Sequence, residues 1–279
     1  MIHWLSLVLF SARNWFWGWT FFLPGFVLEL LSMFTAAVTF YVMGTLVAPG
    51  AESLVAATGL GYGAYIVTGV MFDRFFRSAL VSFHQSLLTG YWANQVNTYM
   101  LYPGGVSAWL AGDLLARFVC FGGLETAVYF AVGVLLFHIP VAFAGLPGVL
   151  LVLAVSVLPL AGLGLIGAST FNLLNAKSWG ANPVEWLVGF AVTLLSGVYF
   201  PPQVLPPPLQ ALGEWLPQTH ALRAARLLLT GQATLADPAV GADLRFLLLF
   251  AAVALPLGAW LFTIGMQRAL REGTLTRWS

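Results

Sequence analysis

Charged side chains are scarce in this sequence. Only 8% of its 279 residues are charged and 60% are hydrophobic, whereas soluble domains carry roughly 25% charged residues. The 11 basic residues, of which Lys177 is the only lysine, are spread along the chain and leave a net charge of +1. Because there is no basic block, we expect no nucleic-acid partner. The composition predicts a membrane protein in contact with the lipid bilayer.

Metal ligands and catalytic motifs are also sparse. Cys120 is the only cysteine, and the 4 histidines are scattered with no pair spaced for a shared metal ion. The sequence contains no aspartate-rich cluster for magnesium pyrophosphate and no G-x-S-x-G nucleophile motif. The context of Lys177, LLNAKSW, lacks the glycines of a phosphate-binding Walker A loop. We therefore predict a chain that is not an enzyme and binds neither a metal nor a cofactor of its own.

Six apolar segments are long enough to approach or exceed a bilayer span, which needs roughly 20 residues. They lie near residues 21–47, 63–88, 109–137, 146–171, 184–200 and 244–266. The glycine-rich run GLGLIG at 162–167 falls inside the fourth segment, which favours close helix packing over a dinucleotide loop. Tryptophans and an arginine in the first 18 or so residues indicate an interfacial helix before the first span.

The distribution of basic residues predicts the orientation. With the N-terminus inside, six basic residues fall at cytoplasmic ends and three outside, while Arg74 and Arg77 are left uncounted because they lie within the second segment. Both termini are then cytoplasmic, in a multi-pass protein of the cell (inner or plasma) membrane. The six inner residues are Arg13, Arg117, Lys177, Arg268, Arg271 and Arg277, and the three outer ones are Arg223, Arg226 and Arg245.

Five of the charged residues within the apolar segments are candidates for function. Glu29 and Glu125 lie in otherwise apolar runs, where a charged group costs at least a few kcal/mol unless it faces protein or water. Each glutamate either serves function or pairs with an intramembrane arginine such as Arg117 or Arg74. In the second segment Asp73 and Arg77 are spaced for an i, i+4 pair, and with Arg74 they either neutralise charge or line a polar route. These five residues are Glu29, Asp73, Arg74, Arg77 and Glu125.

A run of prolines follows the fifth segment. In GVYFPPQVLPPPLQ, residues 197–210, the first two prolines end a helix and the later three are suited to the first turn of a new one. Because broken helix exposed to lipid would leave backbone groups unpaired, this stretch must be shielded or lie at the outer interface. We expect a helical pair that dips back toward the membrane and covers the outer mouth of a pathway. The outer-gate residues on this interpretation are Phe200, Pro201, Leu205 and Pro206.

Residues 196–231 resemble the most recognisable segment of the ABC-2 family, the permease subunits of ATP-binding-cassette exporters. The matching parts, in order, are Phe200-Pro201, Leu205-Pro206, a short helix at 209–215, Leu216-Pro217, Arg226 and a closing LLTG at 228–231. Upstream, YGAYIVTGV at 62–70 is similar to the family's entry to the second span, with Thr68 in place of the usual proline. In TGYWANQVNTYMLYPGG at 89–105, Gly90 and Pro103 match the family's cytoplasmic stretch, whose glutamate is missing here.

The resemblance implies one all-α, polytopic transmembrane domain over residues 1–279. It would have six transmembrane helices, an interfacial helix at about 1–18, a coupling loop at about 89–108 and an extracytoplasmic segment at about 201–243, with a re-entrant helical pair between helices 5 and 6. The permease would dimerise, most simply as a homodimer, and rest on a separate ATPase subunit that holds ATP and Mg²⁺. Apolar residues of the coupling loop would dock in a groove of that ATPase: Tyr91, Trp92, Val96, Tyr99 and Met100.

The function implied is export of an amphipathic or apolar cargo, such as a drug, a natural product or a lipid, by alternating access. A second hypothesis is a secondary transporter driven by protons through Glu29 and Glu125. The two differ in whether transport depends on ATP hydrolysis by a partner or on the proton gradient. A membrane-embedded enzyme is disfavoured because the sequence contains no catalytic constellation.

Overall fold

The computed structural model describes residues 2–21, 23–47, 52–101, 104–175, 177–178 and 182–274. Over these residues the regular secondary structure is entirely helical, as the sequence predicts. The elements are α1 (Ile2–Phe21), α2 (Leu23–Val47), α3 (Glu52–Val55), η1 (Ala56–Thr58), α4 (Tyr62–Trp92), α5 (Val96–Met100), α6 (Gly105–Arg117), η2 (Phe118–Gly123), α7 (Leu124–Leu135), η3 (Phe143–Gly145), α8 (Leu146–Leu173), α9 (Pro183–Leu195), η4 (Pro202–Val204), α10 (Pro207–Gly213), α11 (Pro217–Leu229) and α12 (Pro238–Glu272).

Within the described residues, three helices are long and apolar enough to cross a membrane. They are Pro24–Leu46, Phe143–Leu173 and Pro238–Glu272. Two shorter apolar helices, Leu124–Leu135 and Pro183–Leu195, lie in other predicted spans. The chain is thus an all-helical protein suited to a membrane, and the six-span arrangement stays a prediction.

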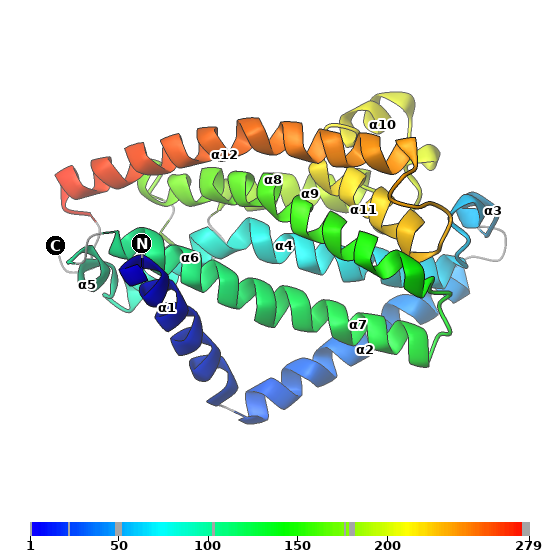
Figure 1. Ribbon diagram of the computed structural model, residues 1–279, viewed down its shortest axis with the longest axis horizontal. Coiled ribbons are helices and arrows are strands. Elements are labelled where there is room, and N and C mark those ends of the chain that lie inside the picture. Colours follow the sequence, from blue (N-terminus) through cyan, green and yellow to red (C-terminus); the bar gives the residue numbers. More distant parts are fainter. Residues whose placement is uncertain are drawn as a thin grey trace.

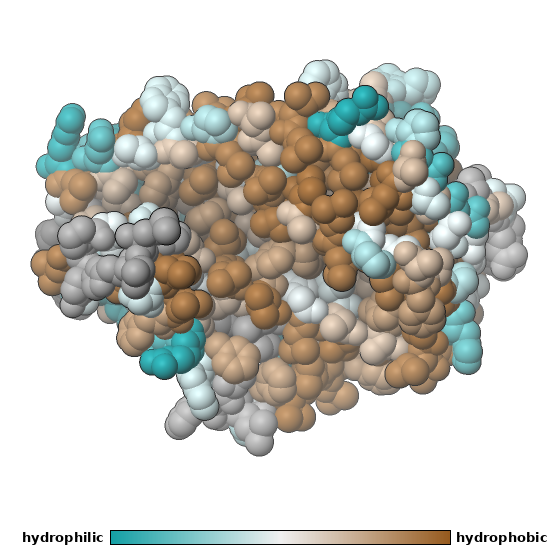
Figure 2. Space-filling model, viewed as in Figure 1, coloured by the Kyte–Doolittle hydropathy of each residue, from teal (hydrophilic) through white to brown (hydrophobic). Residues whose placement is uncertain are grey.

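The long helices run back and forth between two ends of the molecule (Figure 1). One end holds α3, α10 and α11, and the other holds α5, the start of α1 and the end of α12. The π-helical segment η2 joins α6 and α7 into one continuous run. Figure 2 shows apolar side chains over most of the middle of one face, with hydrophilic side chains gathered toward the two ends. This distribution is the one expected of a protein surrounded by hydrocarbon at its waist.

Helix α8 packs against α12, α4 and α11. A Cβ atom on Gly162 of α8 would lie 2.6 Å from the carbonyl carbon of Ala254 of α12, too close for any side chain. The missing side chain lets the two backbones approach, so the small-residue packing predicted for GLGLIG is confirmed.

The helix of the fifth predicted span is shorter than its apolar run. Helix α9 ends at Leu195, and residues 196–200 form bends instead of continuing the helix to Phe200. Gly197 has a φ of +81°, a left-handed conformation that few other residues tolerate. At about 1.5 Å per residue, the 13 residues of α9 rise roughly 20 Å, less than the hydrocarbon thickness.

The prolines begin the helical pair predicted from the sequence. Pro207 lies in the first turn of α10 and Pro217 in the first turn of α11, where the missing N–H is not needed. Helix α10 thus begins two residues before the predicted helix at 209–215. The structure confirms two helices between α9 and α12, and the re-entrant path through the membrane stays a prediction.

Candidate functional site

The bend after α9 lies directly against α4. The carbonyl oxygen of Val198 occupies the space where a Cβ atom of Gly69 would be. A Cβ at that position would also lie 2.5 Å from Nη2 of Arg226 on α11. The absence of a side chain at Gly69 therefore allows α4, the broken end of α9 and α11 to meet at one point.

Arg226 joins these three segments. It is 4% exposed, and its Nη1 donates to the carbonyl of Gly197 at 2.7 Å. Its Nη2 donates to the carbonyls of Tyr65 at 2.8 Å and Val198 at 3.3 Å, and its Nε approaches Oγ1 of Thr68 at 3.4 Å. The guanidinium carbon lies 3.7 Å from the centroid of the Tyr65 ring, which adds a cation–π contact. The carbonyl groups of Gly197 and Val198, which have no helical partner once α9 has ended, thereby receive hydrogen bonds from a protein side chain.

We call this contact the Arg226 junction: Tyr65, Thr68, Gly69, Gly197, Val198 and Arg226. Tyr65 completes it, because its hydroxyl donates to the carbonyl of Gly197 at 2.8 Å. The junction therefore unites residues from the two motifs that carry the ABC-2 resemblance.

A second polar cluster ties α10, α11 and α12 together. Nδ1 of His220 lies 2.7 Å from Oδ1 of Asp243, and Nη2 of Arg223 lies 2.6 Å from the same oxygen. Arg223 also contacts Glu214 at 2.8 Å, and the ring of His220 stacks on Phe246 at 3.8 Å. Hydrogen bonding to Asp243 is the main cause that raises the pKa of Arg223 above its ordinary value.

The sequence did not identify this cluster, because Asp243 is 20 or more residues from both His220 and Arg223. The one local signal is the i, i+3 spacing of His220 and Arg223, which puts both side chains on one face of α11. The cluster fixes the start of α12 to the helical pair.

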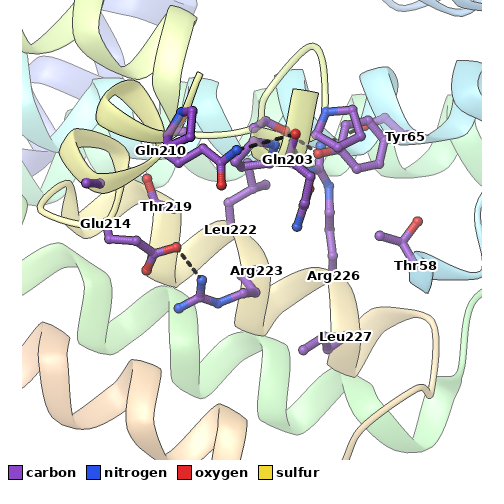
Figure 3. Close-up of a pocket in the computed structure, with 16 residues that line it drawn as sticks. Thr58, Tyr65, Gln203, Gln210, Glu214, Thr219, Leu222, Arg223, Arg226 and Leu227 are labelled. Carbon is purple, nitrogen blue, oxygen red and sulfur yellow. Dashed lines mark hydrogen bonds and ion pairs between the residues drawn. The ribbon is translucent and has the colours of Figure 1, made fainter. Parts of the chain in front are cut away.

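A cavity of about 560 Å³ lies between these two polar groups (Figure 3). Pro201, predicted as a gate residue, lines it, whereas Phe200, Leu205 and Pro206 are not among its lining residues. Its volume lies within the usual range for small-molecule sites, roughly 300–1,000 Å³. The polar residues that line it are Thr58, Tyr65, Ser196, Gln203, Gln210, Glu214, Thr219, Arg223 and Arg226.

The charged residues of the apolar segments form two neighbouring sets. Arg74 of α4 interacts electrostatically with Glu125 of α7 and donates a hydrogen bond to Tyr129, while Glu29 of α2 is close enough to Glu125 to interact with it. Of the two arginines proposed as partners for the glutamates, Arg74 is thus the one that Glu125 meets. We call Glu29, Arg74 and Glu125 the intramembrane triad.

The second set is an ion pair along α4. Asp73 and Arg77 are 3.8 Å apart, which matches the predicted i, i+4 pair. The Arg77 side chain is 39% exposed. An exposed cation within an apolar segment requires water, protein or lipid head groups beside it.

Arg117 has a different partner from the one considered in the sequence. Its Nε lies 3.1 Å from Oδ2 of Asp113 on the same helix, and Ser86 of α4 donates a hydrogen bond to that carboxylate. This group belongs to the end of the molecule that holds α5 (Figure 1). It joins α6 to α4.

The docking residues of the predicted coupling loop are divided between two helices. Helix α4 continues to Trp92, a turn follows, and α5 covers Val96–Met100. Residues 102–103, including Pro103, lie outside the described residues.

Most of the predicted docking residues pack within the chain. Val96 is 2% exposed, and Tyr99 stacks on Trp109 with ring centroids 4.6 Å apart. Tyr91 and Met100 pack against the same apolar cluster. By contrast, Trp92 is 42% exposed. Leu101, which was not among the predicted docking residues, is 80% exposed.

No protein-family model matches this chain. A search of curated proteins also finds no significant match. The ABC-2 resemblance therefore depends on the residues of the chain itself, chiefly those of 196–231.

Proposed function

We propose that this chain is the permease subunit of an ATP-driven exporter of the ABC-2 type. On this proposal α2, α4, the run from α6 to α7, α8, α9 and α12 cross the cell membrane. Both termini are cytoplasmic, and α1 lies in the interface. Two copies of the chain form the pathway, and a separate ATPase subunit binds ATP and Mg²⁺.

The observation that carries the proposal is the Arg226 junction. The resemblance depends on two motifs far apart in the sequence, YGAYIVTGV and the proline-rich segment that ends in LLTG. Tyr65 and Gly69 of the first motif contact Arg226 of the second. Contact between residues of two separate motifs is expected if the motifs form one structural unit, whereas chance matches have no reason to touch.

The placement of the smaller helices agrees with the proposed sidedness. Helices α10 and α11 lie at one end and α5 at the other, where α1 begins and α12 ends (Figure 1). On this proposal the first end faces outward and the second faces the ATPase. Exposed Trp92 and Leu101 are then the apolar contacts available for helix-in-groove docking.

The cargo is an amphipathic or apolar molecule that enters from the cytoplasm or inner leaflet. The intramembrane triad and the Asp73–Arg77 pair supply polar groups on an otherwise apolar route. ATP binding by the partner would move α5 and α4 together, because Tyr99 and Val96 are packed into the apolar cluster that contains α4 residues. The chain's own residues bind and orient the cargo and perform no chemistry on it.

The test is co-purification followed by transport. The tagged chain is purified from its native membrane, and a subunit with a Walker A motif should co-purify with it. Reconstituted together, the two should export a fluorescent amphipathic dye in a manner that requires ATP and is stopped by vanadate. Transport that persists with an inactivated ATPase would refute the proposal.

One observation favours the proton-coupled alternative. Glu29 and Arg74 both interact electrostatically with Glu125, so two carboxylates from α2 and α7 lie near each other within apolar segments. That function predicts transport by the chain alone, driven by an imposed pH gradient and abolished by a protonophore. Proteoliposomes without any ATPase distinguish the two functions directly.

A further inference from the structure

The charge of Arg226 has no carboxylate partner within the described residues. All of its hydrogen bonds there go to uncharged acceptors, three backbone carbonyls and one hydroxyl. The two nearby acids are engaged elsewhere, since Glu214 and Asp243 both pair with Arg223. A guanidinium that is 4% exposed thus keeps its positive charge beside a cavity with only dipoles to stabilise it.

One donor of Arg226 also remains available. A guanidinium has five N–H groups. The hydrogen bonds of the described residues use four of them and leave one on Nη1. Burial lowers the pKa of Arg226 because it penalises the charged form, and a bound anion would oppose that penalty.

The rest of the cavity has both polar and apolar lining. Nε2 of Gln210 donates to the carbonyl of Leu205 at 2.7 Å, and Gln203 also lines the cavity (Figure 3). Leu222, Leu227 and Ala211 supply apolar wall. A ligand with one anionic group and an apolar portion would match this lining.

We propose that this outer cavity binds the anionic head group, a phosphate or a carboxylate, of an amphipathic molecule, and that Arg226 supplies the positive charge. Arg223 is already neutralised by two carboxylates and therefore contributes less. The proposal goes beyond transport, because binding to the cavity requires neither an ATPase nor movement of cargo.

The test is calorimetric titration of the full-length chain in nanodiscs with three probes. Octyl phosphate carries both an anionic group and a tail, inorganic phosphate has only the anion, and octyl glucoside has only an uncharged head and the tail. We expect octyl phosphate to bind at least about tenfold more tightly than either other probe, since octyl glucoside lacks the charge that Arg226 would meet and inorganic phosphate lacks the tail that the apolar wall would cover.

Two tryptophan variants separate the cavity from the surrounding lipid. Ala211 lines the cavity, whereas its neighbour Leu212 is 56% exposed and does not line it. We expect Ala211→Trp to remove octyl phosphate binding and Leu212→Trp to leave it unchanged. Because neither variant replaces a residue of the Arg226 junction, the test does not require a variant of Arg226 that folds.

Three outcomes would overturn the proposal. Equal affinity for octyl glucoside would show that charge is not recognised. Equal affinity for inorganic phosphate would show a site for a free anion instead of an amphipathic one. Unchanged octyl phosphate binding in Ala211→Trp would place the ligand outside this cavity.

Discussion

The carbonyl oxygen of Val198 occupies the space that a side chain on residue 69 would need. This relationship links a glycine in the middle of α4 with the bend that ends α9. It explains how the helix of the fifth apolar run can end at Leu195, before it is long enough to cross a bilayer. The freed carbonyls turn toward α4 and Arg226, so their hydrogen bonds are made inside the protein.

Replacement of Gly69 by alanine should destabilise the chain by about 2 kcal/mol, because the added methyl group overlaps Val198 and Arg226. Thermal unfolding of the detergent-solubilised protein measures the change. Gly61→Ala is the matched control, since a Cβ there has no neighbour within 4 Å. Equal unfolding temperatures for the two variants would contradict the close approach of α9 and α4.

Replacement of Arg226 by lysine should destabilise the chain by about 3 kcal/mol even though the charge is kept. An ammonium group cannot reproduce the fork that contacts Gly197, Tyr65 and Val198 together. Arg245→Lys serves as the control, because Arg245 is exposed and donates only to Gly241 of its own helix. If both lysine variants unfold like the wild type, the planar fork is not what holds the junction.

The elements of the fold could be predicted from the sequence better than their contacts. Hydrophobic runs and proline positions indicated the long helices and the pair α10–α11, because those signals are local. The Arg226 junction required knowing that α4 and α11 meet, although the sequence analysis had singled out both motifs. The resemblance predicted that Val96 and Tyr99 dock on a partner, whereas they pack within the chain. The apolar character of these residues does not tell whether the chain itself or a partner covers them.

Loss of the Asp243 charge should detach α12 from the helical pair. Asp243→Asn removes the buried carboxylate that buried His220 and partly exposed Arg223 contact, which should cost about 3 kcal/mol. Glu272→Gln breaks only the exposed pair with Arg268 and should cost less than about 1 kcal/mol. Chemical denaturation monitored by tryptophan fluorescence compares them, and equal effects would mean that the cluster adds no stability.

Acidic substitutions near α5 should separate docking from folding. Trp92→Asp and Leu101→Asp change exposed side chains, so we expect a normal unfolding temperature but ATP hydrolysis uncoupled from transport. Tyr99→Asp removes the stacking on Trp109 and should lower stability by about 3 kcal/mol. Stability and vanadate-sensitive transport are measured for all three. Coupled transport in both Trp92→Asp and Leu101→Asp would exclude this surface as the ATPase contact.

Neutralising a glutamate of the intramembrane triad should change transport more than stability. Glu125→Gln removes the carboxylate that interacts with Arg74 on the proposed route, and Glu29→Gln removes its neighbour. We expect transport in each variant to fall about tenfold, equivalent to roughly 1.4 kcal/mol in the barrier, with the dependence on ATP retained. Initial rates of dye export at several pH values, alongside the control Glu272→Gln, measure this.

Wild-type rates in both glutamate variants would mean that the glutamates only hold helices together. Loss of the response to pH without any requirement for ATP would instead favour proton coupling, because the carboxylates would then be the groups that carry the proton.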